Sequence, residues 1–91
     1  MKAIQIKYLP PTDTLGSRWK VWADGVGSMT APVDMTIVPT LGGGYKETAP
    51  FNPEAQAEAL ASDFAETKWG LGILGIGTLP NGNYVALLSN D

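Results

Sequence analysis

The sequence predicts an α+β fold in which one helix packs on one face of a small antiparallel sheet, with the elements in the order β-β-β-α-β-β. Three observations predict this fold. Two segments near the N-terminus alternate apolar and polar residues, which is typical of half-buried strands. Residues 53–69 carry an apolar stripe at helical spacing, and Asn81-Gly82 is a strong signal for a two-residue hairpin turn.

The first strand is expected over Ala3–Leu9. Ile4 and Ile6 fall on one face of this segment, while Lys7 points to the other. Pro10 follows at once, and a proline cannot donate a hydrogen bond to a strand ladder. The strand should therefore end at Leu9.

The second strand is expected over Arg18–Ala23, where Trp19 and Val21 alternate with Lys20 and its neighbours. Residues 28–38 indicate a third, poorer strand. Pro32 interrupts that strand, so it is either an edge strand or two short pieces. Residues 39–50 contain three consecutive glycines between two prolines, and we expect a long loop there.

The helix is expected over Pro53–Trp69. Asn52 is a favourable N-cap residue, and proline fits the first helical position. One stripe follows the helical period, with Lys68 extending it by its aliphatic stem; it consists of Ala57, Leu60, Ala61, Phe64 and Lys68. Gly70 ends the helix, because glycine tolerates the left-handed backbone found there.

The last two strands should form a hairpin about Asn81-Gly82. A two-residue loop pairs Leu79 with Tyr84 and, further out, places Val85 and Leu87 on the face that the helix covers. The expected core of the whole domain comprises Ile4, Ile6, Trp19, Val21, Leu60, Phe64, Ile76, Val85 and Leu87.

The length indicates a single domain, residues 1–91, near the lower end of the usual size range. The chain has no cysteine and therefore no disulfide, so its core must suffice for stability unless self-association contributes. A homodimer is thus one option that the sequence leaves open.

The chain also has no histidine. Histidine and cysteine supply most general bases, thiol nucleophiles and tight transition-metal ligands. Residues 70–75 match the dinucleotide pattern G-x-G-x-x-G, but they follow a helix and open a strand, which inverts the context that pyrophosphate binding requires. We therefore expect no enzyme, no cofactor and no metal site.

A cluster of basic and aromatic side chains is the first candidate binding surface. Arg18, Lys20 and Trp22 alternate onto one strand face, and Lys7 joins them if the first two strands pair. Single-stranded nucleic acid is held by such groups, with bases stacked on aromatic rings and phosphates neutralised nearby. The net charge of −3 opposes backbone binding, so a protein partner and a purely structural role remain as alternatives.

The second candidate surface is the face expected to carry Gly75, Gly77 and Tyr84. Glycines in a strand allow another backbone or ring to approach closely. Tyr84 either lies across Gly77 and fills this gap or leaves a flat apolar patch of the kind that marks interfaces.

Several stretches of the chain resemble a widespread group of short proteins encoded by phages, plasmids and integrative elements. The resemblance rests on Lys2-Ala3-Ile4, Lys7-Tyr8-Leu9-Pro10-Pro11-Thr12, Gly16-Ser17-Arg18, Lys20 and Ala23-Asp24-Gly25, together with the alanine-rich helix and Leu79-Pro80-Asn81-Gly82-Asn83-Tyr84-Val85. Between residues 33 and 52 this chain is longer than the pattern of the group. The resemblance implies an accessory gene product of a mobile element, and such products are often inhibitors or adaptors, including inhibitors of host defence.

The sequence therefore predicts a non-enzymatic accessory protein that binds a protein partner. Its candidate binding residues are Lys7, Arg18, Lys20, Trp22 and Tyr84. The alternative is a small protein that binds single-stranded nucleic acid. The N-terminus lacks the apolar stretch of a signal peptide and no segment is apolar enough to span a bilayer, so we expect a cytoplasmic protein with no membrane partner.

Overall fold

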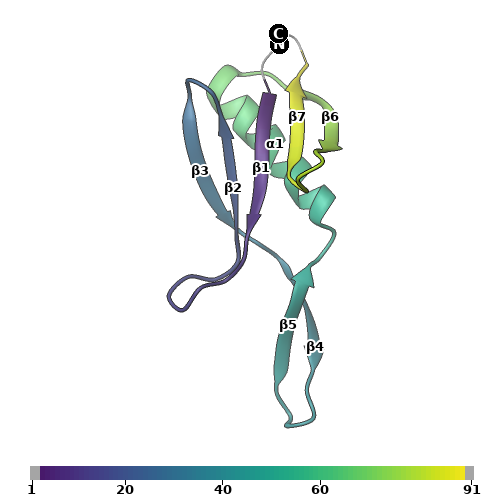
Figure 1. Cartoon of the computed structure of the whole chain (residues 1–91). Helices are drawn as coiled ribbons and strands as arrows, with labels where there is room; N and C mark the ends of the chain where they lie inside the picture. The colour runs from purple at the N-terminus through teal and green to yellow at the C-terminus, as the bar shows by residue number, and fades with distance from the viewer. Residues whose placement is uncertain (1–2, 90–91) are drawn as a thin grey trace.

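The computed structural model describes residues 3–89, so Lys2, one of the residues that carry the resemblance, lies outside the described part (Figure 1). The chain is α+β, with one helix and seven strands in antiparallel sheets. In chain order the elements are β1 (Ala3–Leu9), β2 (Arg18–Ala23), β3 (Gly27–Pro32), β4 (Met35–Pro39), β5 (Tyr45–Pro50), α1 (Pro53–Trp69), β6 (Ile73–Thr78) and β7 (Tyr84–Leu88).

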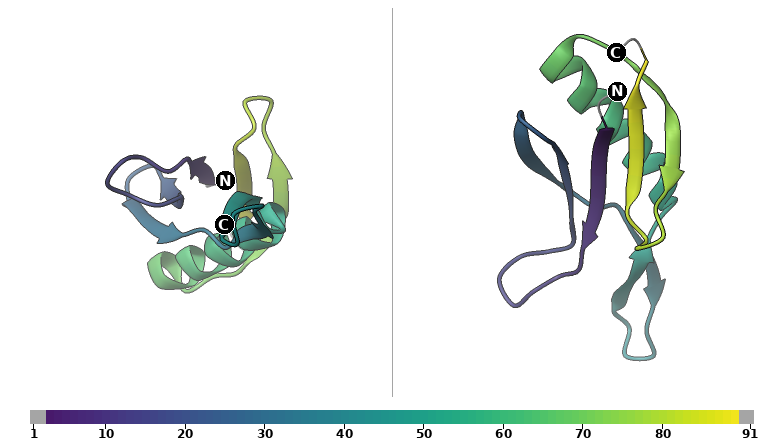
Figure 2. Two further views of the ribbon diagram at one scale, coloured as in Figure 1. Left: turned by 90° about the horizontal axis from the view of Figure 1, so that it is seen from below. Right: turned by 45° about the horizontal axis from the view of Figure 1, so that its top comes forward.

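Five of the strands form the main antiparallel sheet, in the order β3-β2-β1-β7-β6, and α1 packs across one face of it (Figures 1 and 2). β4 and β5 form a separate two-stranded hairpin that projects from the sheet-and-helix body (Figure 1). This projection makes the molecule elongated, with extents of 52 × 24 × 24 Å. The predicted sheet and helix are confirmed, and the projecting hairpin is an addition to them.

Both ends of the helix lie where the sequence predicts them. Gly70 adopts the left-handed conformation, with φ of 67°, and its N–H donates to the Glu66 carbonyl at 2.9 Å. Asn52 differs from the expectation: it is itself left-handed, with φ of 46°, and its side chain makes no capping hydrogen bond. Its carbonyl instead accepts from the backbone N–H of Gln56, so Asn52 serves through its tolerance of a left-handed backbone.

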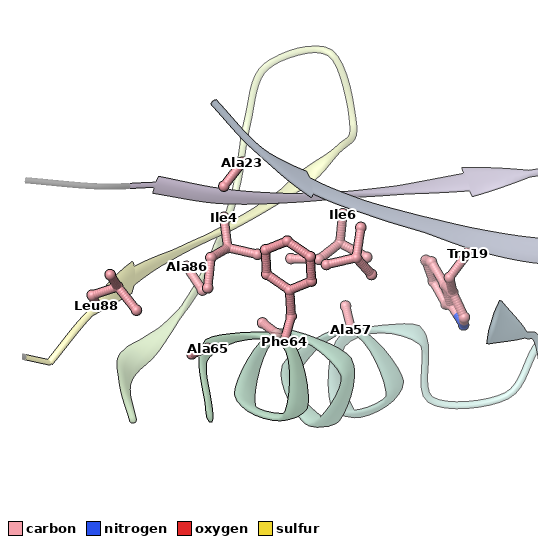
Figure 3. Packing of buried hydrophobic residues seen from close by; sticks show 11 residues of the cluster. Ile4, Ile6, Trp19, Ala23, Ala57, Phe64, Ala65, Ala86 and Leu88 are labelled. Carbon is pink, nitrogen blue, oxygen red and sulfur yellow. The ribbon is translucent and has the colours of Figure 1, made fainter. Parts of the chain in front are cut away.

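The core lies between α1 and the sheet. Phe64 points from the helix toward Ile4 and Ile6 of β1, and all three side chains are fully buried (Figure 3). The other helix residues in the core are alanines, whose small side chains let the helix approach the sheet closely. The buried set comprises Ile4, Ile6, Trp19, Val21, Ala23, Ala57, Ala61, Phe64, Ala65, Ala86 and Leu88.

The predicted register of the β6–β7 hairpin is wrong by one residue. Thr78, not Leu79, lies opposite Tyr84. The loop closes through the Gly82 N–H donating to the Leu79 carbonyl at 2.9 Å and the Leu79 N–H donating to the Asn83 carbonyl at 2.7 Å. Of the two residues that a type I′ turn requires at positive φ, only Gly82 has it, at 89°.

Pro80 explains the difference. Its fixed φ suits the second position of an ordinary β-turn, so the loop takes three residues and ends on a left-handed glycine. A one-residue change of register moves side chains to the opposite face of the sheet. Val85 and Leu87, predicted in the core, therefore lie on the outer face, and Ala86 and Leu88 are buried in their place. Leu60 and Ile76 pack at the edge of the core and are partly buried.

The segment from 28 to 50 also differs from the expectation. The third strand divides as the sequence allowed: β3 is an edge strand that ends at Pro32, and β4 begins at Met35. Residues 39–50, predicted as a loop, contain β5 instead, which pairs with β4. We call this β4–β5 hairpin, residues 35–50, the arm.

The side chain of Gln56 links the base of the arm to the body. The Gln56 Oε1 atom accepts hydrogen bonds from the Trp19 indole N–H at 3.1 Å and from the Asp34 backbone N–H at 2.9 Å. Its Nε2 atom donates to the carbonyls of Asp34 and Phe51, the residues on either side of the arm. The Gln56 oxygen thus accepts two hydrogen bonds and the Gln56 nitrogen donates two. If the amide were rotated by 180°, its nitrogen would face the two N–H donors, so the orientation is fixed by these bonds.

Within residues 3–89, no helix has both the length and the apolar character that crossing a membrane requires.

Candidate interaction surfaces

The main sheet has two very different faces. α1 packs against β6, β1, β7 and β2 from one side, whereas no second layer of the described chain covers the opposite side (Figure 2). We call this second side the uncovered face. Side chains alternate along each strand, so every second residue of β1, β2 and β7 projects there.

Four of the predicted binding residues meet on the uncovered face. Lys7 of β1 lies directly opposite Lys20 of β2, and Arg18 and Trp22 flank Lys20 on the same side of β2. The Lys20 Nζ atom lies 5.2 Å from the centre of the Trp22 ring, a cation–π contact. The first two strands pair, and the prediction that Lys7 then lies beside the other three residues is confirmed. We call Lys7, Arg18, Lys20 and Trp22 the basic–aromatic cluster.

The cluster combines exposed charged side chains with half-buried ones. Lys7 and Lys20 are exposed, while Arg18 and Trp22 are half-buried. Arg18 also donates to the Gly16 carbonyl at 3.4 Å, which ties it to the preceding loop. A half-buried tryptophan has little side-chain freedom left to lose on binding, which favours its use as an anchor at an interface.

Tyr84, the fifth predicted residue, lies on the other side of the sheet. Its ring makes an edge-to-face contact with Trp19, with the ring centres 6.2 Å apart. It also borders an open hollow of about 520 Å³ at the start of α1, lined by Asn52, Pro53, Glu54, Ala55, Glu58 and Tyr84. The sheet thus separates Tyr84 from the basic–aromatic cluster, and Tyr84 does not lie across Gly77 as one reading had it.

The uncovered face also carries an apolar groove over β6 and β7. The groove has a volume of about 320 Å³ and is lined by Leu74, Gly75, Ile76, Gly77, Val85 and Leu87. The two glycines make it hollow: a Cβ atom built on Gly75 meets nothing within 4 Å, and one on Gly77 meets only the Val85 Cγ1 atom, at 4.0 Å. Gly75 and Gly77 of the predicted surface therefore line the groove, and Val85 and Leu87 lie where Tyr84 was predicted.

The arm is the feature that the sequence reasoning missed. It and its base expose five large apolar side chains, Ile37, Val38, Leu41, Tyr45 and Phe51. Leu41 stands fully exposed at the tip, and Tyr45 is 78% exposed. The signal was present in the β-branched run of residues 36–38 and in Tyr45, which flank the glycines as two strands flank a hairpin loop.

Nothing in the described chain marks a catalytic centre. No group of three or more potential metal-ligating side chains gathers among residues 3–89. The buried residues of this part of the chain are all apolar, so no fully desolvated polar or charged side chain occurs in it.

Comparisons with protein-family models, with curated proteins and with solved structures gave no match for this chain.

Proposed function

We propose that this chain is a non-enzymatic accessory protein that binds a protein partner through the uncovered face, with the basic–aromatic cluster at the centre of the contact. The resemblance to proteins of phages, plasmids and integrative elements suggests the setting. In that setting the chain acts in the cytoplasm as an inhibitor or adaptor of a host protein, for example one of a defence system.

The observation that carries the proposal is the alignment of the cluster across two strands. Lys7 and Lys20 are cross-strand neighbours, and Lys20 lies over the ring of Trp22. Tryptophan and arginine are enriched among the residues that dominate the binding energy of protein interfaces. Three neighbouring cations favour a partner that presents carboxylates.

The surroundings of the cluster favour protein over nucleic acid. Gln5 of β1 lies between Trp22 on one side and Val85 on the other, so the basic area continues into the apolar groove. An apolar core beside a charged rim is the composition of a protein interface. A platform for single strands would instead present several stacking rings, and Trp22 is the single aromatic residue that the described β1, β2, β6 and β7 place on this face.

The second candidate function is binding of single-stranded nucleic acid through the same cluster. Three cations on the same face as one half-buried ring favour it, because they can neutralise phosphates while a base stacks on Trp22. The net charge of −3 and the thin basic footprint weigh against it.

Capture from a host lysate tests the proposal. Tagged wild-type chain is compared with the variants Trp22→Ala and Lys20→Glu after nuclease treatment, and retained proteins are identified by mass spectrometry. We expect one protein to be retained by the wild type and lost with both variants. Leu15→Ala is the control, because Leu15 is an exposed residue in the β1–β2 loop. Retention that is equal for all four chains, or that depends on nucleic acid, would contradict the proposal.

A further inference from the structure

We infer that the arm of one chain docks its apolar tip into the β6–β7 groove of a second copy, so that two chains exchange arms in a symmetric dimer. This inference goes beyond the proposed function, because it fills the groove with the arm of a second copy of the chain. The basic–aromatic cluster, beside the docked arm, stays open to the protein partner.

The arm has no strand partner outside itself and exposes large apolar side chains, which favours a second molecule covering it. β4 and β5 pair with each other and with no strand of the main sheet. A two-stranded hairpin alone in water is marginally stable. This one also carries apolar side chains into solvent: Ile37 and Tyr45 project from one face, and Leu41 occupies the turn at the tip.

Two backbone hydrogen bonds close the loop at the tip of the arm, residues 40–44. The Thr40 N–H donates to the Gly44 carbonyl at 2.9 Å, and the Gly43 N–H donates to the Thr40 carbonyl at 3.2 Å. Gly43 has φ of 85°, so this loop repeats the three-residue turn that joins β6 to β7. Leu41 takes the place that Pro80 holds in that other turn, and its side chain is held out at the end of the arm.

The groove matches the tip in chemistry and in size. Its lining is apolar, and the missing side chains of Gly75 and Gly77 leave its floor open. A cavity of roughly 150 Å³ is sufficient to hold a benzene molecule. The groove, at about 320 Å³, therefore has room for a leucine side chain and part of a neighbouring residue.

A second copy is the occupant that the structure favours. The arm extends away from the main sheet (Figure 1), and no residue of the arm is among those that line the groove. A strand of five or six residues spans roughly 17 to 20 Å, so an arm lying along β6 of another chain carries Leu41 over the groove.

The exposed area agrees with a dimer. Aromatic side chains bury 150–250 Å² each and aliphatic ones less, so Ile37, Leu41 and Tyr45, on one face and the tip of the arm, present roughly 400 Å². Two arms and two grooves would bury on the order of 1,200 Å² or more, which reaches the range of specific interfaces. Reciprocal exchange also closes the assembly at two chains, as isologous contacts do.

Disulfide cross-linking tests the contact directly, because the natural chain has no cysteine. In the double variant Leu41→Cys, Gly77→Cys, mild oxidation should give a covalent dimer on a non-reducing gel. Each single variant should give at least tenfold less. A double variant that cross-links no better than the single variants would overturn the inference, since Leu41 would then not lie against Gly77 of the other chain.

The mass in solution provides the second test. Sedimentation equilibrium should give twice the 9.6 kDa of one chain. Leu41→Asp and Gly77→Val should each weaken the dimer by about 100-fold, since each dimer contains the contact twice. Leu15→Asp is the matched control and should leave the mass unchanged, and circular dichroism checks the fold of each variant. A wild type that stays monomeric at millimolar concentration, or that forms open-ended assemblies, would refute the exchange of arms between two chains.

Discussion

The indole N–H of Trp19 donates to the side-chain oxygen of Gln56 at 3.1 Å and thereby joins the core to the base of the arm. Trp19 is fully buried in β2, and it also makes edge-to-face contacts with Tyr8 and Tyr84. The Gln56 side chain also hydrogen-bonds to the backbone N–H and carbonyl of Asp34, which precedes the arm. A residue of the helix therefore links the base of the arm to the core.

Replacing Gln56 with methionine tests this role. The Gln56→Met variant keeps the volume but leaves the Trp19 N–H and the Asp34 N–H without their acceptor, while the Asp34 carbonyl keeps its bond from the Phe51 N–H. We expect the free energy of unfolding to fall by about 1–3 kcal/mol, the usual cost of a buried group that loses its hydrogen bond. The amide of Phe51, which donates to Asp34 at 2.9 Å, should exchange faster with deuterium.

The matched control for that variant is Gln5→Met, at a half-buried position on the uncovered face. It should change neither the stability nor the exchange of the Phe51 amide. If Gln56→Met behaves like Gln5→Met, the arm is not held through Gln56.

Adjacent leucines test the register of the β6–β7 hairpin. Leu88 is fully buried, whereas Leu87 is 38% exposed on the other face. Leu88→Ala should cost about 2–5 kcal/mol in urea denaturation, the range for leucine removed from a core, and Leu87→Ala should cost much less. The reverse order of costs would mean that the two-residue Asn81-Gly82 turn forms after all.

Phe64 tests the packing of the helix on the sheet. It is fully buried, and it makes an edge-to-face contact with Trp69 at 5.8 Å between ring centres. Phe64→Ala should cost about 3–5 kcal/mol, a large part of the stability of a domain this small. Thermal unfolding followed by circular dichroism measures the loss, and an unchanged melting temperature would show that this helix face is not the core.

Titration with a mixed-sequence single-stranded oligonucleotide at low salt separates the two candidate functions. We expect no change in tryptophan fluorescence, because the proposed partner is a protein. Nucleic-acid binding would instead quench Trp22 and weaken linearly in log salt, with a slope of roughly −2 to −3 for three or four phosphates. Trp22→Phe is the control, since Trp19 and Trp69 also fluoresce.

The elements with local signals could be predicted from the sequence. Pro53 and Gly70 mark the helix ends, and both ends lie where those residues indicate. Alternation assigned Lys20 and Trp22 to one face of β2, because a strand has a strict period of two. Lys7 needed in addition the pairing of β1 with β2, which the short connection between them favours.

The remaining features depend on competition between signals or on distant contacts. Asn81-Gly82 favours one turn and Pro80 another, and the proline determined which side of β7 faces the core. The glycines of residues 42–44 indicated a loop, yet Gly43 forms the turn of a hairpin. The role of Gln56 was not visible at all, since its partners lie five, 22 and 37 positions away in the chain.

Photo-cross-linking from position 22 inside host cells tests the central claim most directly. A chain with p-benzoylphenylalanine in place of Trp22 is irradiated and its adducts are identified, with the same group at Leu15 as the control. The proposal that the basic–aromatic cluster meets a protein predicts one discrete protein adduct from position 22 that is absent from position 15. Adducts with nucleic acid, or the same adducts from both positions, would contradict it.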